Sequence, residues 1–185
     1  MARGAKAAMV RAADKVLPRE EIARRLTALR SHGSGPIVFT NGVFDLLHVG
    51  HVRYLEYARN LGAALVVGIN SDESVRSLDK APGRPVVPAR ARAEVVAALA
   101  CVDYACIFDE ARPDATLRVI RPDIHVKSSS YTLDTLPEAA TVAELGARIV
   151  LAPHIPGEST SELVARIRGE QRSNDAAPRS ESTPS

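Results

Sequence analysis

The stretch PIVFTNGVFDLLHVGH, residues 36–51, decides how this chain folds. Its first five residues are mostly β-branched or apolar, which is typical of a buried strand, and Asn41-Gly42 is a turn signal that ends the strand. Apolar residues then recur at helical spacing from Val49 to Leu61, so His48 and His51 lie in the first turn of a helix. The stretch therefore predicts a strand, a tight loop and a helix in succession.

The two histidines of this stretch stand where a helix attracts anions. Unpaired backbone N–H groups and the positive end of the helix dipole lie at a helix N-terminus, and both attract phosphate oxygens. Because His51 follows His48 by three positions, the imidazoles share one helix face, and Gly50 lets a ligand approach the backbone. The pattern favours phosphate contacts, and the alternative is a histidine pair that caps the helix and satisfies buried carbonyls.

Outward from this stretch, short apolar runs alternate with segments of helical periodicity. Strands are expected at 36–40, 64–70, 104–108, 123–127 and 148–152, and helices near 18–29, 49–61, 72–78, 89–100, 112–120, 135–145 and 160–168. Such alternation is typical of an α/β fold in which helices cover both faces of a parallel sheet of about five strands. Ligands bind such sheets beyond the carboxyl ends of the strands, and the first expected strand ends at the histidines.

Length and composition indicate one domain. The 185 residues are 45% hydrophobic, which is enough for a core of ordinary size, and we expect the domain at residues 18–170. The basic, alanine-rich residues 1–17 are expected to be a flexible segment. Residues 171–185 are expected to be a disordered tail, because their polar composition cannot repay the entropy of ordering.

Composition also argues against several classes of partner. A net charge of +2, an aromatic content of 4% and the absence of Trp give no basis for nucleic-acid binding. No apolar run approaches the roughly 20 residues that cross a membrane, so no membrane partner is expected. Cys101 and Cys106 lie in an apolar stretch and are expected to be inert core thiols, with a disulfide or metal role as the alternative. Together these features predict a cytoplasmic protein.

The loop and the two histidines at residues 40–51 carry a family resemblance. The string Thr40-Asn41-Gly42-Val43-Phe44-Asp45, followed by His48-Val49-Gly50-His51, resembles the signature of the nucleotidyltransferases with an HxGH motif. The resemblance covers about residues 37–167 and implies a single Rossmann-like domain whose nucleotide pocket lies at the histidine motif. Further segments stand in the order seen in heptose 1-phosphate adenylyltransferases: Asn70-Ser71-Asp72, Ser74-Val75, Lys80, Gly83-Arg84-Pro85, Arg92, Ala97-Ala98-Leu99, Val102-Asp103, Arg121-Pro122-Asp123 and Gly157-Glu158-Ser159-Thr160.

The chemistry that the resemblance implies is transfer of a nucleotidyl group. An acceptor phosphate attacks the α-phosphorus of a nucleoside triphosphate and pyrophosphate leaves, so hydrogen-bond donors must stabilise the growing charge. The acceptor phosphate is already ionised near neutral pH, which removes the need for a strong base. His48 and His51 are therefore the expected catalytic residues, acting as phosphate contacts in the transition state.

Two other anion contacts are expected from polar segments. Lys80 lies in a turn-rich loop, and we expect this catalytic lysine to close onto the triphosphate or the acceptor phosphate, with Arg92 adding a second positive charge. The alternative for Lys80 is a solvated lysine. Ser159 and Glu162 form a capping box, which a plain helix cap explains equally well. The resemblance instead places Ser159 and Thr160 against the nucleotide phosphates.

The resemblance also assigns the remaining candidate residues. Thr40, Asn41, Gly42 and Phe44 face the nucleotide, and the alternative is that they form only a strand-to-helix turn. Gly50 and Lys127 complete the nucleotide set, and the acceptor set is Asp45, Asn70, Asp72, Lys80, Ser129, Ser130 and Tyr131. The alternative for Asp45 is that it orients a neighbouring group or caps the coming helix. Ser128-Ser129-Ser130 departs from the Gly-Gly-Asp that is usual in the family after the lysine, which leaves the choice of acceptor and nucleotide open.

The leading hypothesis is an enzyme that couples ATP with a sugar 1-phosphate, with heptose 1-phosphate as the favoured acceptor, to give an ADP-sugar and pyrophosphate. The alternatives are CTP or GTP as the donor, another acceptor such as glycerol 3-phosphate, and a nucleotide-binding module without catalysis. Mg²⁺ is expected as a cofactor with ATP, and no residue is assigned as a metal ligand because no carboxylate cage is visible. A separate sugar kinase is expected upstream, and a homodimer is expected because relatives often form dimers.

Overall fold

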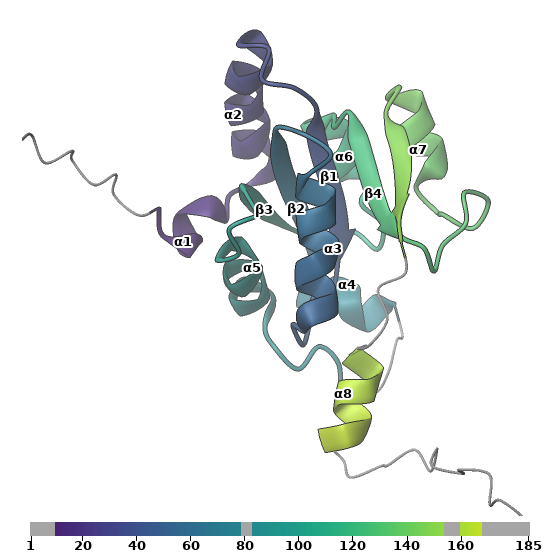
Figure 1. Ribbon diagram of the computed structural model, residues 1–185. Helices are drawn as coiled ribbons and strands as arrows, with labels where there is room; N and C mark the ends of the chain where they lie inside the picture. The colour runs from purple at the N-terminus through teal and green to yellow at the C-terminus, as the bar shows by residue number, and fades with distance from the viewer. Residues whose placement is uncertain (1–9, 79–82, 154–159, 168–185) are drawn as a thin grey trace, which may run out of the picture.

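A parallel sheet organises the structure, a computed structural model that describes residues 10–78, 83–153 and 160–167. Within these residues the order of the strands is β3-β2-β1-β4-β5, so the strand order reverses at β1 (Figure 1). The predicted α/β class with a parallel sheet of five strands is confirmed. The strands are β1 (Ile37–Gly42), β2 (Ala64–Asn70), β3 (Tyr104–Phe108), β4 (Ile124–Ser128) and β5 (Arg148–Ala152).

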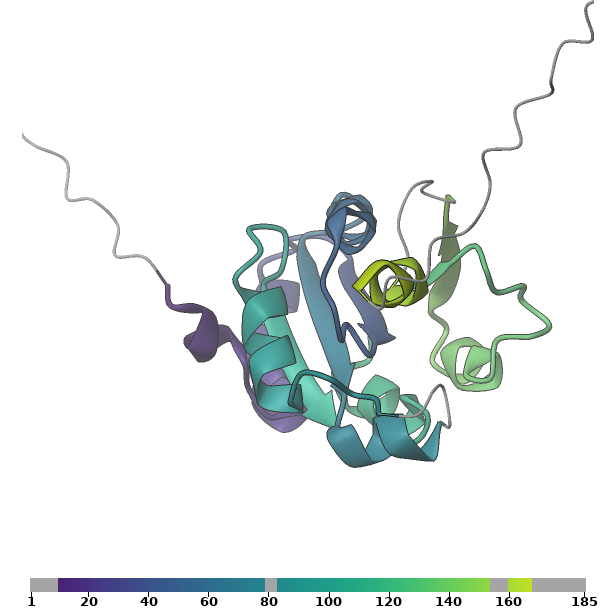
Figure 2. The ribbon, with the colours of Figure 1, turned by 90° about the horizontal axis from the view of Figure 1, so that it is seen from below.

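Helices cover both faces of the sheet, as Figure 1 and Figure 2 show from two sides. On one face, α3 (Val49–Arg59) and α5 (Ala89–Ala97) bury their apolar stripes. On the other face, α2 (Arg19–Ser31), α6 (Asp114–Ile120) and α7 (Ala139–Glu144) do the same. The structure also contains α4 (Asp72–Ser77), which directly follows β2, and α8 (Thr160–Ile167).

Each central strand is apolar on both sides because helices cover both sides. In β1, Ile37 and Phe39 join the core under α2 and α6, whereas Val38 between them joins the core under α3 and α5. In β2, Val66 and Val67 divide in the same way. This alternation follows from the period of two along a strand. The continuous apolar runs of the sequence therefore correspond to doubly covered parallel strands.

The N-terminal segment departs from the expectation of flexibility over residues 1–17. Ala12–Lys15 form a short helix, α1, that packs on α5. Val16 is buried and forms a parallel bridge with Ala105 of β3, and the Lys15 ammonium donates to the carbonyl of Val102 at 2.8 Å. The physical reason is that the edge strand β3 offers unpaired backbone groups and an apolar surface to a short extended segment. Residues 1–9 and the expected tail at 171–185 lie outside the described residues.

The boundaries of several elements differ from the predicted ones by a few residues. β1 continues to Gly42, two residues beyond the expected end, because its pairing with β2 holds as far as the Gly42–Ile69 pair. The last helix before β5 begins at Ala139 instead of 135. Pro137 explains this late start, because a proline disfavours the helical conformation of the residue before it.

Backbone pairing between β1 and β4 stops early, and this places the candidate site. β1 pairs with β2 over its whole length, but with β4 only at Val38–Ile124 and Phe39–His125. Beyond Phe39 the carboxyl ends of β1 and β4 are no longer joined by a backbone ladder. The strand order reverses at this same point, where open α/β sheets bind ligands.

Tyr54 of α3 occupies the position at which the two strands separate. Its hydroxyl donates to the carbonyl of Val126 in β4 at 2.9 Å and lies 2.7 Å from the hydroxyl of Thr40 in β1. Because a phenol has a single proton, Thr40 is the donor in the second bond. Burial raises the pKa of Tyr54, so the phenol stays protonated and both bonds persist at neutral pH. One side chain thus replaces the missing ladder between β1 and β4.

Replacing Tyr54 by phenylalanine tests this bridging role. Tyr54→Phe keeps the ring but leaves the Thr40 hydroxyl and the Val126 carbonyl without their partner, which is expected to lower the free energy of unfolding by about 1–3 kcal/mol. Urea denaturation followed by circular dichroism measures the change. The control is Tyr57→Phe on the same helix, because the Tyr57 hydroxyl has no hydrogen bond within the described residues. Equal stability of the two variants would contradict the bridging role.

Candidate active site

The two histidines lie against each other at the start of α3. His48 is the N-cap residue with an extended backbone, and His51 lies in the first turn. Their ring centroids are 3.9 Å apart, and the His48 backbone N–H donates to Nδ1 of His51 at 3.4 Å. The Phe44 ring packs on His51, and the centroids of these two rings are 5.2 Å apart. The helix N-terminus therefore presents two imidazoles backed by one aromatic ring.

His51 is a neutral hydrogen-bond donor in this setting. Burial lowers the pKa of His51 to about 4, and the nearby charges of His48 and Arg84 act in the same direction. Because Nδ1 accepts the bond from His48, we assign the ring proton to Nε2. At neutral pH the side chain can thus donate one N–H to an anionic oxygen without first losing or gaining a proton.

The loop before the histidines has a shape that Gly42 and Phe44 determine together. Phe44 has a positive φ of 49°, which is rare for a residue with a side chain, and its ring lies over Gly42. A Cβ at Gly42 would meet that ring at 3.0 Å, so any side chain there would push Phe44 off its place beside His51. Gly42 and Phe44 therefore act on the site through loop geometry.

The Thr40 hydroxyl has a partner within the protein core. Thr40 is fully buried, and its hydroxyl bonds to Tyr54 in the core. The side chain belongs to the link between β1 and β4, and its contact with the nucleotide stays a prediction.

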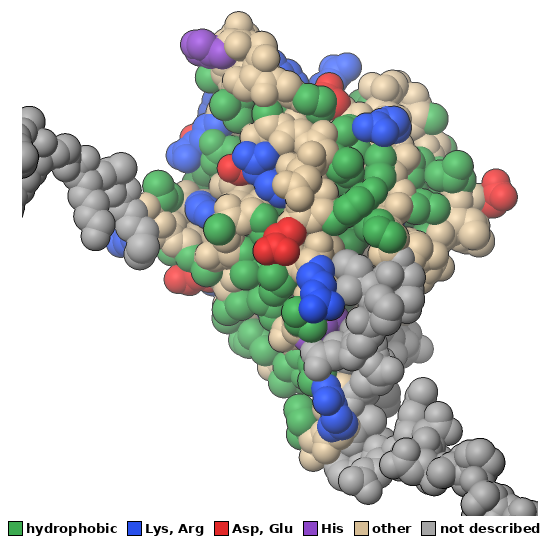
Figure 3. Space-filling view, viewed as in Figure 1, with side chains coloured by type: hydrophobic (Ala, Val, Ile, Leu, Met, Phe, Trp, Pro, Cys, Tyr) green, Lys and Arg blue, Asp and Glu red, His purple; other side chains and the backbone are tan. Residues whose placement is uncertain are grey.

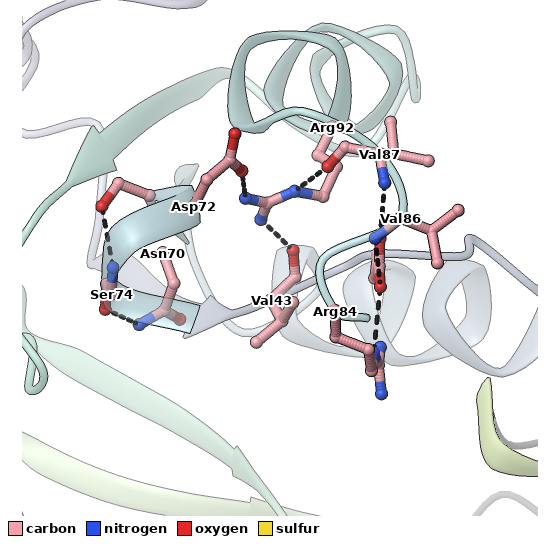
Figure 4. A network of polar contacts seen from close by, with 10 residues as sticks. Val43, Asn70, Asp72, Ser74, Arg84, Val86, Val87 and Arg92 are labelled. Carbon is pink, nitrogen blue, oxygen red and sulfur yellow. Dashed lines mark hydrogen bonds and ion pairs between the residues drawn. The ribbon is translucent and has the colours of Figure 1, made fainter. Parts of the chain in front are cut away.

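Asp45 fastens the loop at residues 84–87 to the histidine loop. Its carboxylate is 0% exposed and accepts hydrogen bonds from the backbone of Val86 and of Val87, both at 2.9 Å. The Nε of Arg84 donates to the second oxygen, also at 2.9 Å (Figure 4). Burial acts to raise the pKa of Asp45, but the two backbone N–H groups and Arg84 outweigh it and lower the pKa. Both oxygens of Asp45 thus have partners within the protein, and its contact with the acceptor stays a prediction.

The Arg92 side chain is buried, and its guanidinium links neighbouring segments of the chain. Its guanidinium is 0% exposed and donates to the carbonyls of Val87 at 2.8 Å and Val43 at 2.6 Å. The third contact is an ion pair with Asp72 at 2.7 Å (Figure 4). All three nitrogens donate to protein oxygens, and the action of the Arg92 charge on the triphosphate stays a prediction. Asp72 was also expected to contact the acceptor. Its carboxylate forms the ion pair with Arg92, and its side chain is one-third exposed.

Asn70 ends β2 beside this network and is turned inward. It is buried, and its Nδ2 donates to the hydroxyl of Ser74 at 2.9 Å, which itself donates to the carbonyl of Glu110 (Figure 4). The expected acceptor residue therefore stabilises the turn from β2 into α4. Together with Arg92 and Asp72, it fixes the framework on the β2 side of the histidines.

A second buried network lies on the β4 side, and sequence reasoning missed its central residue. Glu138, with its side chain 3% exposed, lies 3.1 Å from Nε2 of His125 and 3.0 Å from the Lys127 ammonium. Lys127 also donates to the side-chain oxygen of Asn41 at 3.3 Å and lies 5.0 Å from the centroid of the Tyr131 ring. Side chains thus join the carboxyl ends of β1 and β4 where the backbone does not.

The charge of Glu138 is stabilised in this network. Burial acts to raise its pKa, but the hydrogen bond from His125 and the charge of Lys127 prevail and lower the pKa of Glu138 to about 2. Burial lowers the pKa of His125. The sequence signal was an acidic residue inside the apolar run Leu136-Pro137-Glu138-Ala139-Ala140, which is typical of a buried, paired charge.

The remaining candidates lie at the edge of this region or beyond the described residues. Ser129 and Ser130 are exposed, and Ser130 bonds to Ser128 within the turn after β4. Gly50 lies between the histidines in the first turn of α3. Lys80 and Ser159 fall outside the described residues, and Thr160 begins α8 with a side chain that is likewise not described.

The described residues contain neither a metal-binding cluster nor a membrane-spanning helix. Among the described residues, no group of three or more His, Cys, Asp or Glu side chains is arranged to hold a metal ion. Cys101 and Cys106 are both free thiols. Burial raises the pKa of Cys106 to about 12, which makes this thiol unreactive at neutral pH. No helix in the described ranges is long and apolar enough to cross a membrane.

A parallel sheet that ends at an imidazole pair is the geometry that the resemblance implies, and comparison with known proteins agrees. The family model described as cytidylyltransferase-like matches residues 39–166, which include both histidines, most of β1 and all of β2 to β5. The chain belongs to the cytidylyltransferase-like family.

Relatives within this family carry more specific names. The chain is 47% identical over 154 residues to the D-beta-D-heptose 1-phosphate adenylyltransferase of Bordetella bronchiseptica, covering 83% of this chain and 94% of that protein. It is 45% identical over 153 residues to the bifunctional protein HldE of Syntrophotalea carbinolica. That match covers 83% of this chain but 31% of HldE, so the chain spans about a third of the length of this bifunctional relative.

A solved structure supports the same cytidylyltransferase-like fold. The lipopolysaccharide core biosynthesis protein of Thermoplasma volcanium superposes with a TM-score of 0.57 at 27% sequence identity. The match covers 65% of this chain and 99% of that protein. The Rossmann-like architecture predicted from the sequence is therefore confirmed.

The neutral state of His51 is directly measurable. In the free protein we expect the His51 ring to titrate near pH 4, because burial and its cationic neighbours disfavour the imidazolium. Adding ATP is expected to raise the pKa, because the phosphates bring negative charge next to the ring. Ring resonances followed by NMR between pH 3.5 and 8, assigned with His51→Gln, measure both values. A midpoint between pH 6 and 7 in the free protein would contradict the assignment.

Removing the central acid of the second network is expected to destabilise the fold. Glu138→Ala leaves the buried Lys127 ammonium without its counter-charge and Nε2 of His125 without its acceptor, which we expect to cost about 3–5 kcal/mol in urea denaturation. Because the fold lowers the pKa of Glu138 from 4.5 to about 2, its contribution is full above about pH 4.5 and is lost as the pH falls toward 2.

The control for this variant is Glu144→Ala on the same helix. Glu144 forms an exposed ion pair with Arg118, and pairs of this kind contribute little to stability. A Glu138→Ala protein as stable as Glu144→Ala at pH 7 would show that the buried network does not stabilise the fold.

Proposed function

We propose that this chain is a heptose 1-phosphate adenylyltransferase, which joins ATP and heptose 1-phosphate into an ADP-heptose and releases pyrophosphate. The observation that carries the proposal is the imidazole pair at the first turn of α3, next to the carboxyl end of β1. The bacterial protein that carries this name is 47% identical to the chain and is covered over 94% of its length. Such coverage supports the same reaction for the domain as a whole.

The reaction needs charge stabilisation more than proton transfer. A phosphate oxygen of the sugar 1-phosphate attacks the α-phosphorus of ATP, the bond from this phosphorus to the bridging oxygen breaks, and the pyrophosphate takes the electron pair. Negative charge grows on the equatorial and leaving oxygens. The neutral Nε2–H of His51, the His48 ring and the N-terminal amides of α3 supply donors for these oxygens.

Several assignments beyond the histidines belong to the same proposal. Lys80, Ser159 and Thr160 bind the triphosphate, as the family resemblance implies. Lys127 and Asn41 hold the nucleotide from the β4 side, where their side chains meet. Ser129, Ser130 and Tyr131 follow β4 at its carboxyl end and face the acceptor, and the serines in place of the family's Gly-Gly-Asp set acceptor choice there.

Mg²⁺ enters this scheme as part of the nucleotide substrate. Oxygens of phosphate and water are the ligands that Mg²⁺ prefers. The described carboxylates around the histidines are occupied, since Asp45 binds Arg84 and two backbone N–H groups and Asp72 binds Arg92. These residues fit a metal held by the triphosphate better than a metal held by the protein. We also propose that a separate kinase supplies the sugar 1-phosphate, that the reaction takes place in the cytoplasm and that the enzyme is a homodimer.

Pyrophosphate release from a panel of substrates tests the reaction. Purified protein with ATP and heptose 1-phosphate is expected to release pyrophosphate in step with ADP-heptose formation. Replacing ATP by CTP or GTP, or heptose 1-phosphate by glycerol 3-phosphate, is expected to give little product. If product forms only with a different nucleotide or a different acceptor, the protein is a nucleotidyltransferase of the same family with other substrates. ATP binding without pyrophosphate release for any acceptor would favour a non-catalytic nucleotide-binding module.

Alanine variants of the two histidines test the site itself. His48→Ala and His51→Ala are each expected to lower kcat by about 100- to 1,000-fold, the usual cost of removing one donor from a developing oxyanion. His32→Ala is the control, because His32 is exposed at the end of α2. Steady-state kinetics at pH 7 measures the change. Wild-type turnover in both active-site variants would rule out the imidazole pair as the centre of the reaction.

A further inference from the structure

Arg84 places a positive charge next to the imidazole pair. Its Nε donates to Asp45, in the loop that leads into the histidines, and its side chain is 20% exposed. Sequence reasoning gave the role of second cation to Arg92, eight residues later. Figure 3 shows Lys and Arg side chains, in blue, beside a histidine, in purple, on the face that carries the N-terminal end of α3.

The two arginines differ in how many donors they have already used. Arg92 is completely buried, and its Nε, Nη1 and Nη2 each donate to a protein oxygen. Arg84 uses Nε alone, for Asp45. Within the described part of the chain its two Nη nitrogens have no hydrogen-bond partner, and Figure 4 shows the far end of the Arg84 guanidinium pointing away from Val86 and Val87. Arg92 is therefore structural, whereas Arg84 keeps donors for a ligand.

Asp45 fixes the direction of Arg84 before any ligand binds. The carboxylate lies in the loop that leads into the histidines, only three residues before His48, and also holds the backbone of Val86 and Val87. The cation is thus anchored to the same loop as the imidazoles. A partly buried guanidinium with one edge fixed and the other open is suited to bind a phosphate group with two parallel hydrogen bonds.

We propose that Arg84 binds a substrate phosphate beside the imidazole pair, and that Asp45 is its positioning residue. The proposal rests on the proposed function, because it concerns the same site. It names phosphate as the ligand chemistry, and two sources can supply that group: the polyphosphate of the nucleotide or the phosphate of the acceptor. An anchored cation near the reacting phosphorus would attract either group and offset the negative charge that the two substrates bring together.

Binding measurements on Arg84→Ala test the proposal without requiring turnover. Isothermal titration calorimetry with ATP, with pyrophosphate and with heptose 1-phosphate is expected to show a loss of about 10-fold or more in affinity for at least one of them. Weaker binding of ATP and pyrophosphate would assign Arg84 to the nucleotide. Weaker binding of heptose 1-phosphate alone would assign it to the acceptor.

The control is Arg118→Ala, which removes the same charge from an exposed position on α6, on the opposite face of the sheet. This variant is expected to bind all three ligands like the wild type. If Arg84→Ala also binds all three like the wild type, the proposal is overturned. A wild-type protein that binds phosphates but forms no ADP-heptose would contradict the proposed function and leave the role of Arg84 standing.

The positioning role of Asp45 needs a readout beyond stability. Asp45→Asn is expected to weaken the same ligand that Arg84→Ala weakens, and the double variant is expected to bind it no more weakly than Arg84→Ala alone. Arg84→Lys keeps the charge without the Nε contact and is expected to fall between wild type and Arg84→Ala, which covers the case of an unfolded Asp45→Asn. Additive losses in the double variant, or wild-type binding by Arg84→Lys, would overturn the positioning role.

Discussion

The early end of the backbone ladder between β1 and β4 is the constraint on which the rest of the site depends. After Phe39 and His125 the two strands have no further paired residues, so side chains hold them together there. Tyr54 does this in the core, and Lys127 with Asn41 does it at the carboxyl edge. Since the strand order reverses at β1, the separation lies where helix N-termini and strand ends can reach a common ligand.

Two buried charge networks flank this separation. On one side Asp45 and Arg92 hold the loop at residues 84–87 to the histidine loop, and on the other Glu138 holds Lys127 and His125. Buried ion pairs contribute little net stability because desolvation offsets their attraction. Their value is in geometry: each network fixes loop segments that would otherwise move against the imidazoles, which suits a reaction that depends on positioned donors.

Several side chains that the sequence assigned to ligands have partners within the protein in the folded structure. Asp45 and Arg92 were expected to touch substrates, yet both have every polar atom bonded inside the protein, and the Thr40 hydroxyl is turned into the core. Arg84 was visible in the same sequence segment as Lys80 but received no role. A charged residue near a motif can serve a ligand or a neighbouring loop, and the choice depends on partners far away in the sequence.

The sequence by itself determined the order of strands and helices, the parallel sheet and the place of the two histidines at a helix start. These features follow from local periodicity, turn residues and the anion affinity of a helix N-terminus, which need no distant partner. The tertiary structure alone decided that Tyr54 bridges β1 and β4, that Val16 adds to the sheet edge and that Glu138 lies between Lys127 and His125. The reason is physical: burial and pairing of polar groups depend on segments that only folding brings together.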